Sequence, residues 1–313
     1  MDDRRTFLVE RARGIGGSDI PAVLGISPWS TPLQLFHEKR KWMEDPDGMV
    51  EENLADEKEW HYWGHKMEPL IAERYEEETG RRCMPCQSLV NPDHSEIRCN
   101  IDYLVYEDEV VGVMDTKNRG GFSKESWDEG PPDYLRAQVL YNAGVLNSYG
   151  ARGEHPATFG SCAVLMGGNR FLWGDLKEED GSLTDPTQGV GLQFVEAAFE
   201  AARNFWSRVK HNDPPPAGPG DLKTLKLLYP DDDHNTIDLP DEAYGLDQRM
   251  SEVSMLLLRY RKEKEEVEAK LREMMGSATF GRIPQGGTYS LKTQKRKAFT
   301  VEATTYRTLR RMK

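Results

Sequence analysis

VVGVMDTKNRGG, residues 110–121, begins with apolar side chains and ends with charged and small ones. Apolar residues at successive positions point to both faces of a strand, which is typical of a strand buried on both sides. Asp115 and Lys117 lie two apart at its end, so they share one face, with Cα atoms about 6.6 Å apart. Because a buried charge is costly unless it is paired or bound to a metal, these two side chains need a partner.

The pattern around this strand alternates between helical and extended segments. Helices are predicted from about Thr31 and over about 64–79, 132–147 and 189–211, and strands over about 82–90, 97–106, 109–117, 157–166 and 170–176. In the second helix, Pro69 suits the first turn and Gly80 the end. The order of helix, three strands, helix and strand predicts an α/β fold with a central mixed sheet flanked by helices.

A Pro/Gly-rich segment, HNDPPPAGPGD at 211–221, is typical of a linker. It predicts a first domain over 1–210 and a helical extension with a basic tail over 222–313. Within the extension, apolar residues recur at alternating spacings of four and three from Leu246 to Met274, with one interruption at Lys264. This heptad pattern predicts a helix that packs on another helix, in the same chain or in a partner.

The composition is that of a soluble globular protein, with 30% charged and 37% hydrophobic residues among 313. There is no apolar run of about 18 residues, which argues against a membrane span. The first residues, MDDRRTFLVE, lack the apolar core of a signal peptide. We therefore expect a cytoplasmic protein.

Four cysteines, Cys83, Cys86, Cys99 and Cys162, are expected to be reduced thiols in such a compartment. CMPC at 83–86 has the spacing of a metal-binding pair, but a structural zinc needs four ligands and no second CxxC follows. The pattern favours ordinary buried thiols, and it leaves open whether Cys83 and Cys86 bind any metal.

The charge is unevenly distributed along the chain. The net charge is −12, yet residues 291–313 carry eight Lys/Arg and one Glu, a net +7 that leaves −19 on the first 290 residues. A basic tail beside an acidic body suggests an anionic partner such as DNA. Lys295, Arg296 and Lys297 are the candidate contacts. The alternative is a solvated tail with no partner.

Three more polar side chains stand in apolar surroundings: Glu68, Asp102 and Gln138. Adjacent strands lie about 4.8 Å apart, so Asp102 and Asp115 at equivalent heights can share one cation. Two oxygen ligands completed by substrate phosphate and water are the usual way in which proteins hold Mg²⁺. Lys117 is expected to lie too far along the strand to pair fully with Asp115 and to orient a water or contact the scissile phosphate. This set predicts metal-assisted phosphodiester hydrolysis.

Other features are expected to have no catalytic role. WHYWGH contains Trp60, His61, Trp63 and His65, and aromatic residues at such spacing predict packing rather than a metal site. DPDGMVEENLADEKE, 45–59, is expected to be a solvated acidic loop.

Four ordered blocks carry a resemblance to a known family: RARGIGGSD, WGHKMEPLIAERY, NIDYLV followed by VMDTKN, and YLRAQVLYN. Over about residues 11–210, the chain resembles the phage-type alkaline exonucleases, which include lambda exonuclease and the YqaJ-like viral recombinases of the PD-(D/E)XK nuclease superfamily. The resemblance implies a restriction-endonuclease-like core. Its element order is the one predicted above from periodicity.

The resemblance also implies roles for individual residues. Asp102 and Asp115 bind the catalytic metal, helped by the backbone carbonyl of Thr116, and Glu68 is a ligand of the second metal. Lys117 activates or positions the attacking water. Gln138 hydrogen-bonds within the cluster. Most relatives have Glu where this chain has Asp115, whose shorter side chain alters the metal spacing.

Contacts to DNA are implied in the same way. Arg11 and Ser18, seven apart, match the positions that hold a terminal 5′-phosphate. Tyr141 matches the aromatic residue that follows the glutamine, and Arg119 is a further candidate DNA contact.

The family's activity completes the expectation. Its members digest one strand of linear double-stranded DNA from 5′ to 3′ with Mg²⁺ or Mn²⁺, two ions per site, and leave 3′ single-strand tails for an annealing protein. Several form homo-oligomers, namely ring-shaped trimers, and the expected location is the cytoplasm of a bacterial host. Two alternatives stay open: a structure- or site-specific endonuclease, including one of host defence, and a non-catalytic DNA-binding assembly protein with a relic site.

Overall fold

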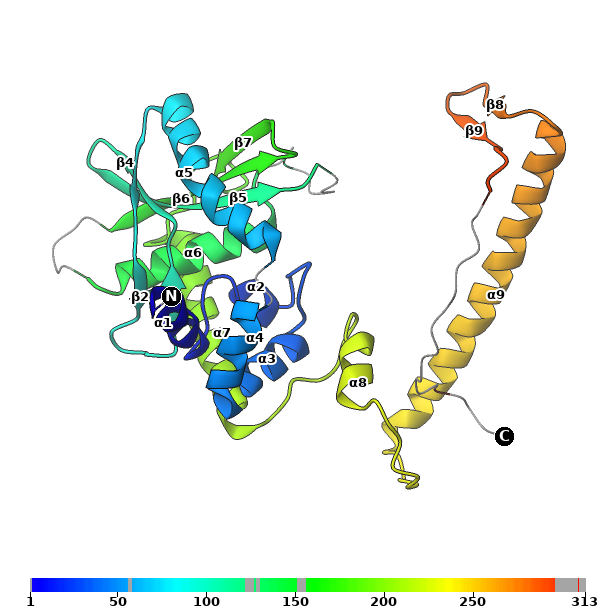
Figure 1. Cartoon of the computed structure of the whole chain (residues 1–313), viewed down its shortest axis with the longest axis horizontal. Coiled ribbons are helices and arrows are strands. Elements are labelled where there is room, and N and C mark those ends of the chain that lie inside the picture. The colour runs from blue at the N-terminus through cyan, green and yellow to red at the C-terminus, as the bar shows by residue number, and fades with distance from the viewer. Residues whose placement is uncertain are drawn as a thin grey trace. The chain divides into compact units, whose positions relative to one another are not determined.

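The computed structural model describes residues 2–55, 58–121, 127, 130–150, 156–295 and 309 (Figure 1). The chain forms two compact units, Met1–Leu225 and Lys226–Lys313. The end of the predicted linker belongs to the first unit, where buried Asp221 accepts a hydrogen bond from the hydroxyl of Thr31. The division into domains around 211–221 stays a prediction.

A five-stranded sheet in the order β1-β4-β5-β6-β7 forms the centre of the first unit. The strands are β1 (Arg82–Pro85), β4 (Tyr103–Glu107), β5 (Val110–Arg119), β6 (Ala157–Met166) and β7 (Arg170–Asp175). β5 and β6 run parallel, whereas the other neighbours are antiparallel. The predicted α/β fold with a central mixed sheet is therefore confirmed.

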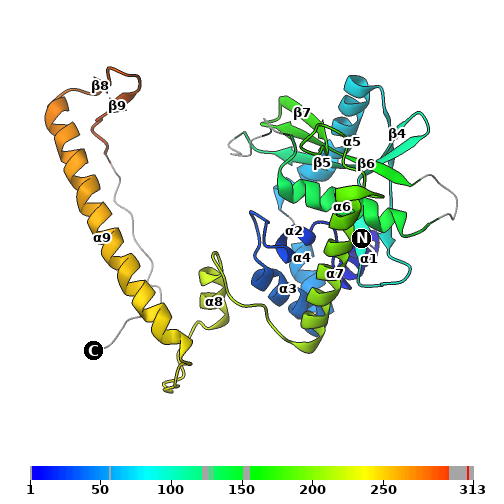
Figure 2. The same ribbon diagram turned by 180° about the vertical axis from the view of Figure 1, so that it is seen from behind.

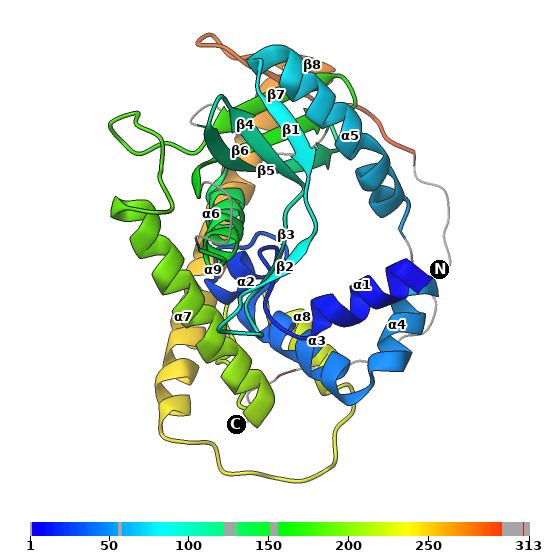
Figure 3. The same ribbon diagram turned by 90° about the vertical axis from the view of Figure 1, so that its left-hand side faces the viewer.

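Helices cover both faces of this sheet. α5 (Glu59–Thr79) packs on one face through Ile71 and Tyr75, and α6 (Asp133–Asn147) packs on the other, where it meets Val111 and Val113. α7 (Gly189–His211) lies against α6 on the side away from the sheet, as Figures 2 and 3 show. This α5–sheet–α6 layering places β5 between two apolar layers, which explains why its side chains are apolar on both faces.

The remaining elements of this unit surround one end of α6. They are α1 (Asp2–Ala12), α2 (Ile20–Val23), α3 (Pro32–Glu44), α4 (Pro46–Ala55) and a two-stranded sheet of β2 (Ser88–Val90) and β3 (Arg98–Asn100). The predicted strands 82–90 and 97–106 were too long, because each breaks into two short strands that belong to different sheets. The helix α1 was not predicted from the sequence.

Three local expectations were wrong. The predicted acidic loop at 45–59 contains α4, whose Met49 and Val50 are buried against Leu8 and Trp42 of the neighbouring helices. Pro69 lies inside α5 rather than in its first turn, because the helix begins ten residues earlier. Trp60 is 67% exposed and therefore does not pack into a core.

The second unit contains one long helix. α8 (Leu222–Leu228) spans the boundary, and α9 (Glu242–Met275) is followed by a hairpin of β8 (Phe280–Arg282) and β9 (Thr288–Ser290). The predicted helix is present, and most of its heptad residues, among them Leu246, Leu257 and Met274, are exposed. Across the ranges that the structure describes, no helix has the length and apolar character needed to cross a membrane.

Candidate active site

Strand β5 brings the charged residues of the opening stretch into the core. Val111, Val113 and Asp115 alternate onto the face of the sheet covered by α6, and Asp115 is only 1% exposed. β4 pairs antiparallel with β5, with Tyr103 opposite Met114. Asp102 directly precedes β4, and its carboxylate is bound to Thr116, the residue after Asp115, so the two carboxylates are neighbours, as expected from the sequence.

Asp115 has partners on both carboxylate oxygens. Oδ1 accepts a hydrogen bond from Nε2 of Gln138 on α6 at 2.5 Å, and Oδ2 lies 2.5 Å from Nζ of Lys117. The expectation that Lys117 lies too far along the strand to pair with Asp115 was therefore wrong. Side chains two apart share a face, and the four-carbon stem of lysine spans the Cα separation.

Asp102 is held by the backbone and side chain of the neighbouring strand. Its Oδ2 accepts hydrogen bonds from the backbone N–H of Thr116 at 2.8 Å and from the Thr116 hydroxyl at 3.0 Å. Thr116 is thus a donor that orients Asp102. The sequence resemblance had assigned only its carbonyl a role.

Glu68 approaches the same cluster from α5. Its Oε1 lies 3.2 Å from Nδ1 of His65, one helical turn earlier. Burial raises the pKa of the Glu68 carboxyl and the negative charge of Asp102 raises it further, whereas His65 and Lys117 act in the opposite direction. The charges of Asp102 and Lys117 therefore reach Glu68, although these residues come from different elements.

The protonation states follow from burial and pairing. Burial raises the pKa of Asp115 to about 6, against the opposing attraction of Lys117. Burial also acts to lower the pKa of Lys117, but Asp115 and Asp102 outweigh it and the pKa is raised overall. Near neutral pH the pair is thus a carboxylate and an ammonium. An ammonium has no lone pair, so Lys117 orients and stabilises anions and does not accept a proton.

The oxygen atoms of this cluster suit a divalent metal. Over the residues that the structure describes, no group of three or more His, Cys, Asp or Glu side chains has the arrangement of a complete metal site. However, Oδ2 of Asp115 is buried, and the partner that the structure gives it is the flexible ammonium of Lys117 at 2.5 Å. A hard carboxylate oxygen in this state is a ligand of the kind that Mg²⁺ and Mn²⁺ prefer.

The glycine-rich loop between α1 and α2 brings Arg11 and Ser18 together. Nη2 of Arg11 donates to Oγ of Ser18 at 3.3 Å. The loop is fixed at Ile15, whose N–H donates to the carbonyl of Glu96 at 2.7 Å and whose carbonyl accepts from the hydroxyl of Tyr141 at 2.8 Å. The guanidinium of Arg11, in the last turn of α1, and the hydroxyl of Ser18, in a loop anchored to the core, therefore lie next to each other.

Sequence reasoning missed the ion pair beneath this loop. Asp19 and Lys39 are 5% and 2% exposed, with Nζ of Lys39 2.6 Å from Oδ2 of Asp19. The same oxygen accepts from the N–H of Gly16 at 3.0 Å, and Arg11 lies 3.9 Å from the other oxygen. Lys39 shares the buried face of α3 with Leu35, and a charge on an apolar helical face was the available signal.

Two predicted DNA contacts have different outcomes. The expectation for Tyr141 was wrong, because its side chain is fully buried, with its ring against Phe199 and its hydroxyl bound to the loop. Arg119 lies two residues beyond Lys117 on the same strand; it donates to the hydroxyl of Tyr134 at 3.2 Å, and its guanidinium lies 5.6 Å from the ring centroid of Trp29. Its direct contact with DNA stays a prediction.

The basic tail is only partly described. Lys295 is exposed, whereas Arg296 and Lys297 lie outside the described residues. All four cysteines are free thiols, and burial raises the pKa of Cys83 to about 12. Cys83 is therefore a neutral thiol near pH 7.

Comparisons with known proteins agree with the sequence resemblance. Residues 6–148 match the model of the YqaJ-like viral recombinase domain. The uncharacterized protein YqaJ of Bacillus subtilis (strain 168) is 25% identical over 286 residues, which cover 90% of this chain and 81% of YqaJ.

Among solved structures, the alkaline exonuclease LHK-Exo of Laribacter hongkongensis aligns with a TM-score of 0.46 and 10% identity, covering 68% of this chain and 94% of the enzyme. The same enzyme in complex with dAMP aligns with a TM-score of 0.45 and 11% identity, covering 71% and 96%. The first half of the chain is therefore similar to the YqaJ-like viral recombinase domain, and the chain is similar to YqaJ of Bacillus subtilis along most of its length.

Proposed function

We propose that this protein is a metal-dependent 5′–3′ exonuclease that hydrolyses one strand of linear double-stranded DNA and leaves 3′ single-strand tails for recombination by strand annealing. One observation carries the proposal: Asp115 is buried beside Asp102 and bound by Lys117 and Gln138. Burying such a set of charges costs stability, and buried charges with shifted pKa values are found most often at functional sites. The similarity of residues 6–148 to a viral recombinase domain supports DNA as the substrate.

The carboxylates would hold the metal. Asp102 and Asp115, with the carbonyl of Thr116, are the proposed ligands of one Mg²⁺ or Mn²⁺ ion, and Glu68 is the proposed ligand of a second. When bound, the ions supply Lewis-acid stabilisation of the charge that builds up on the scissile phosphate.

The other residues orient the two carboxylates or supply a positive charge near them. Gln138 fixes Asp115 through its amide, so that the carboxylate keeps one orientation within the core. The Thr116 N–H and hydroxyl do the same for Asp102. The Lys117 ammonium can turn from Asp115 towards the attacking water or a phosphate oxygen, since its stem is flexible and a charge-assisted hydrogen bond is available from either.

The glycine-rich loop is the proposed contact for the 5′ end of the strand. Arg11 offers a planar, paired set of donors that fits a phosphate, and Ser18 adds a hydroxyl beside it. The buried pair of Asp19 and Lys39 below holds the loop in place, and Asp19 also lies 3.9 Å from Arg11, whose guanidinium it helps to position. Arg119 and the basic residues Lys295, Arg296 and Lys297 are proposed contacts to the DNA backbone.

Digestion of DNA with defined ends tests the activity. Linear duplexes labelled at the 5′ or the 3′ end are compared with a covalently closed circle, in Mg²⁺, Mn²⁺ or EDTA. We expect release of the 5′ label first, progressive shortening of one strand, and no product from the circle or in EDTA. Cutting of the circle favours the endonuclease alternative, and binding without cleavage in any metal favours the non-catalytic assembly protein.

The proposed biological setting follows from the same activity. The single-strand tails need an annealing protein as partner, and we propose a homo-oligomer, a trimer, acting in the cytoplasm of a bacterial host. Sedimentation of the full chain, alone and mixed with a single-strand annealing protein, tests both partners. A chain that sediments as a monomer alone and also in the mixture contradicts this part of the proposal.

A further inference from the structure

A large aromatic side chain stands exposed beside the candidate active site. Trp29, in the loop between α2 and α3, is 68% exposed. Tryptophan is on average one of the more buried residues, and an exposed one marks a contact surface when its surroundings fix it in place. The proposed roles of Asp102, Asp115 and Glu68 do not use it.

The loop that carries Trp29 is held by its own hydrogen bonds. The N–H groups of Ile26 and Ser27 donate to the carbonyl of Pro21 at 2.9 and 3.0 Å. The N–H groups of Trp29 and Ser30 both donate to Oγ of Ser27 at 3.2 Å. Because the backbone on both sides of the indole is fixed, a ligand that stacks on the ring loses little free energy in ordering it.

Arg119 links this indole to the catalytic strand. Its guanidinium lies 5.6 Å from the centroid of the Trp29 ring, within the range of a cation–π contact. Asp115, Lys117 and Arg119 alternate along β5 and so share one face. Arg119 thus lies two positions beyond Lys117 and four beyond Asp115, on the same face of the strand that carries the proposed cleavage site.

We propose that Trp29 and Arg119 form a stacking platform for one nucleobase of the strand that is cut, next to the scissile phosphate. This inference rests on the proposed function. Every base has a flat π-face that stacks on an aromatic ring, and a guanidinium stacked on the same ring adds a positive charge for the neighbouring phosphate. The platform takes any of the four bases, because stacking reads no hydrogen-bond pattern. It holds the strand at a fixed step relative to Asp115.

An abasic-site scan tests the platform. The full chain carrying Asp115→Asn binds 5′-phosphorylated duplexes without cutting them, and each duplex carries one abasic nucleotide at a successive position from the 5′ end. We expect one position at which the missing base weakens binding about 5- to 150-fold. Trp29→Ala should weaken binding to intact DNA by a similar factor, and the abasic nucleotide at that position should then have no further effect.

Matched variants separate stacking from other effects. Trp29→Phe keeps an aromatic face and should retain most of the coupling to that position, whereas Trp29→Leu keeps only apolar surface and should lose it. Arg119→Lys keeps the charge but not the planar guanidinium, so it should lose part of the coupling to that position. Trp60→Ala removes an equally exposed tryptophan from α5 and should leave the abasic-site profile unchanged.

The outcomes distinguish this inference from the proposed function. Cleavage of unmodified DNA by the wild-type chain is measured in parallel, and thermal melting checks that each variant is folded. If wild type cleaves DNA but the effects of Trp29→Ala and of every abasic site are additive, the platform is wrong and the exonuclease stands. If wild type neither binds nor cleaves DNA, both are wrong.

Discussion

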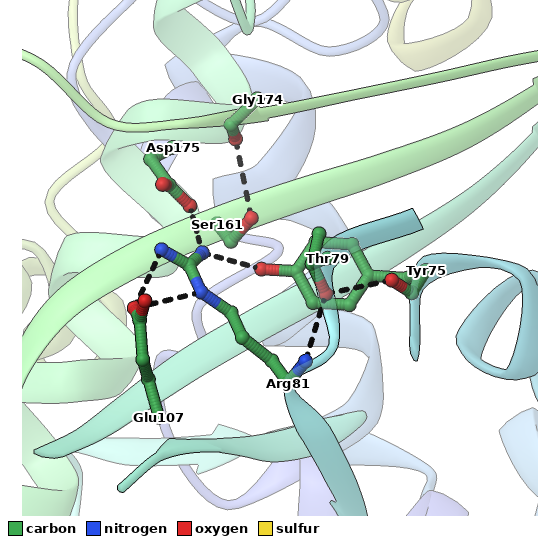
Figure 4. A network of polar contacts seen from close by, with 7 residues as sticks. All are labelled: Tyr75, Thr79, Arg81, Glu107, Ser161, Gly174 and Asp175. Atoms are coloured by element: carbon green, nitrogen blue, oxygen red, sulfur yellow. Dashed lines mark hydrogen bonds and ion pairs between the residues drawn. The ribbon is translucent and has the colours of Figure 1, made fainter. Parts of the chain in front are cut away.

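Two groups of charges lie on the same sheet and differ in how their charges are balanced. In one, shown in Figure 4, Arg81 lies between α5 and β1 and makes an ion pair with Asp175 at 2.7 Å and another with Glu107 at 2.8 Å. Its Nη1 also donates to the hydroxyl of Tyr75 at 2.8 Å, and its guanidinium covers the ring of Phe159 at 4.8 Å. The guanidinium therefore has partners on all sides.

The group around Asp115 brings like charges together. Burial and the negative charge of Asp102 raise the pKa of the Asp115 carboxyl to about 6, although the ammonium of Lys117, 2.5 Å from Oδ2, opposes this rise. The comparison shows how a charge cluster that links strands differs from one that is proposed to bind a metal. The first is neutralised by its own partners, whereas the second keeps an excess of negative charge for a cation at a cost in stability.

The largest expected effect is on catalysis. Asp115→Asn keeps the size of the side chain and an acceptor for Gln138, and Lys117→Met keeps an unbranched stem. Each should reduce the single-turnover cleavage rate about 10³-fold or more, because each removes a charge proposed to act on the metal or the phosphate. The double variant, which removes both buried charges together, should melt close to wild type. Retention of a tenth of the activity by Asp115→Asn would contradict the assignment.

The opposite result is expected for the other cluster. Arg81→Ala leaves the buried carboxylate of Asp175 without its partner and should lower the free energy of unfolding by about 3 kcal/mol. The cleavage rate per folded molecule should stay close to wild type. Arg74→Ala is the control, since its ion pairs with Glu77 and Glu78 are exposed, and water screens such pairs so that their loss should change the free energy of unfolding far less. Urea denaturation measures the free energy of unfolding of both variants. Equal losses of stability in Arg81→Ala and Arg74→Ala would contradict a structural role for the Arg81 cluster.

A third group, around the glycine-rich loop, lies between the two. Asp19 and Lys39 neutralise each other in a buried ion pair, but the side chain of Arg11 is half exposed. A charge-assisted contact from Arg11 to a terminal phosphate is worth about 1.5–3 kcal/mol, or roughly ten- to a hundredfold in rate. Wild type should therefore digest 5′-phosphorylated duplex faster than 5′-hydroxyl duplex by this factor, and Arg11→Ala should abolish the preference. Arg13→Ala, at an exposed ion pair, is the control; an equal loss on both substrates would indicate a role for Arg11 in folding or general DNA binding.

The smallest expected effect is the pH dependence of metal binding. The folded pKa of Asp115, about 6, lies above the unfolded value near 3.9, so the folded protein holds a proton between these limits that the unfolded chain has released. Stability from this group therefore falls as the pH rises from about 4 to 6. Metal competes with that proton. The rise in Tm caused by Mg²⁺ over EDTA should be small at pH 5 and larger at pH 7.5.

Asp115→Asn provides the check on this assignment. Its response to Mg²⁺ should be weaker and should lose the step near pH 6. A wild-type response of equal size at pH 5 and pH 7.5 would show that Asp115 does not control metal binding.

The sequence alone determined the order of the main elements. Periodicity predicted β5, α6, β6, β7 and α7 within one or two residues, because side-chain burial on a regular strand or helix repeats at a fixed interval. It also predicted that Asp102 and Asp115 lie side by side, since both are charges within apolar strands that follow one another. The break of each of the first two strands left no periodic signal, and the four short segments were read as two.

Only the tertiary structure determined which side chains contact one another. Lys117 forms an ion pair with Asp115, although the sequence analysis expected it to lie too far away to pair fully. Tyr141 is buried under the glycine-rich loop, although the sequence analysis expected it to contact DNA. Asp19 forms a buried ion pair with Lys39, twenty residues away in the sequence, and the side chain of Trp29 is exposed. A local pattern reports which face of an element is buried. The partner of each polar group depends on rotamers and on elements distant in sequence, and these are fixed only when the layers pack.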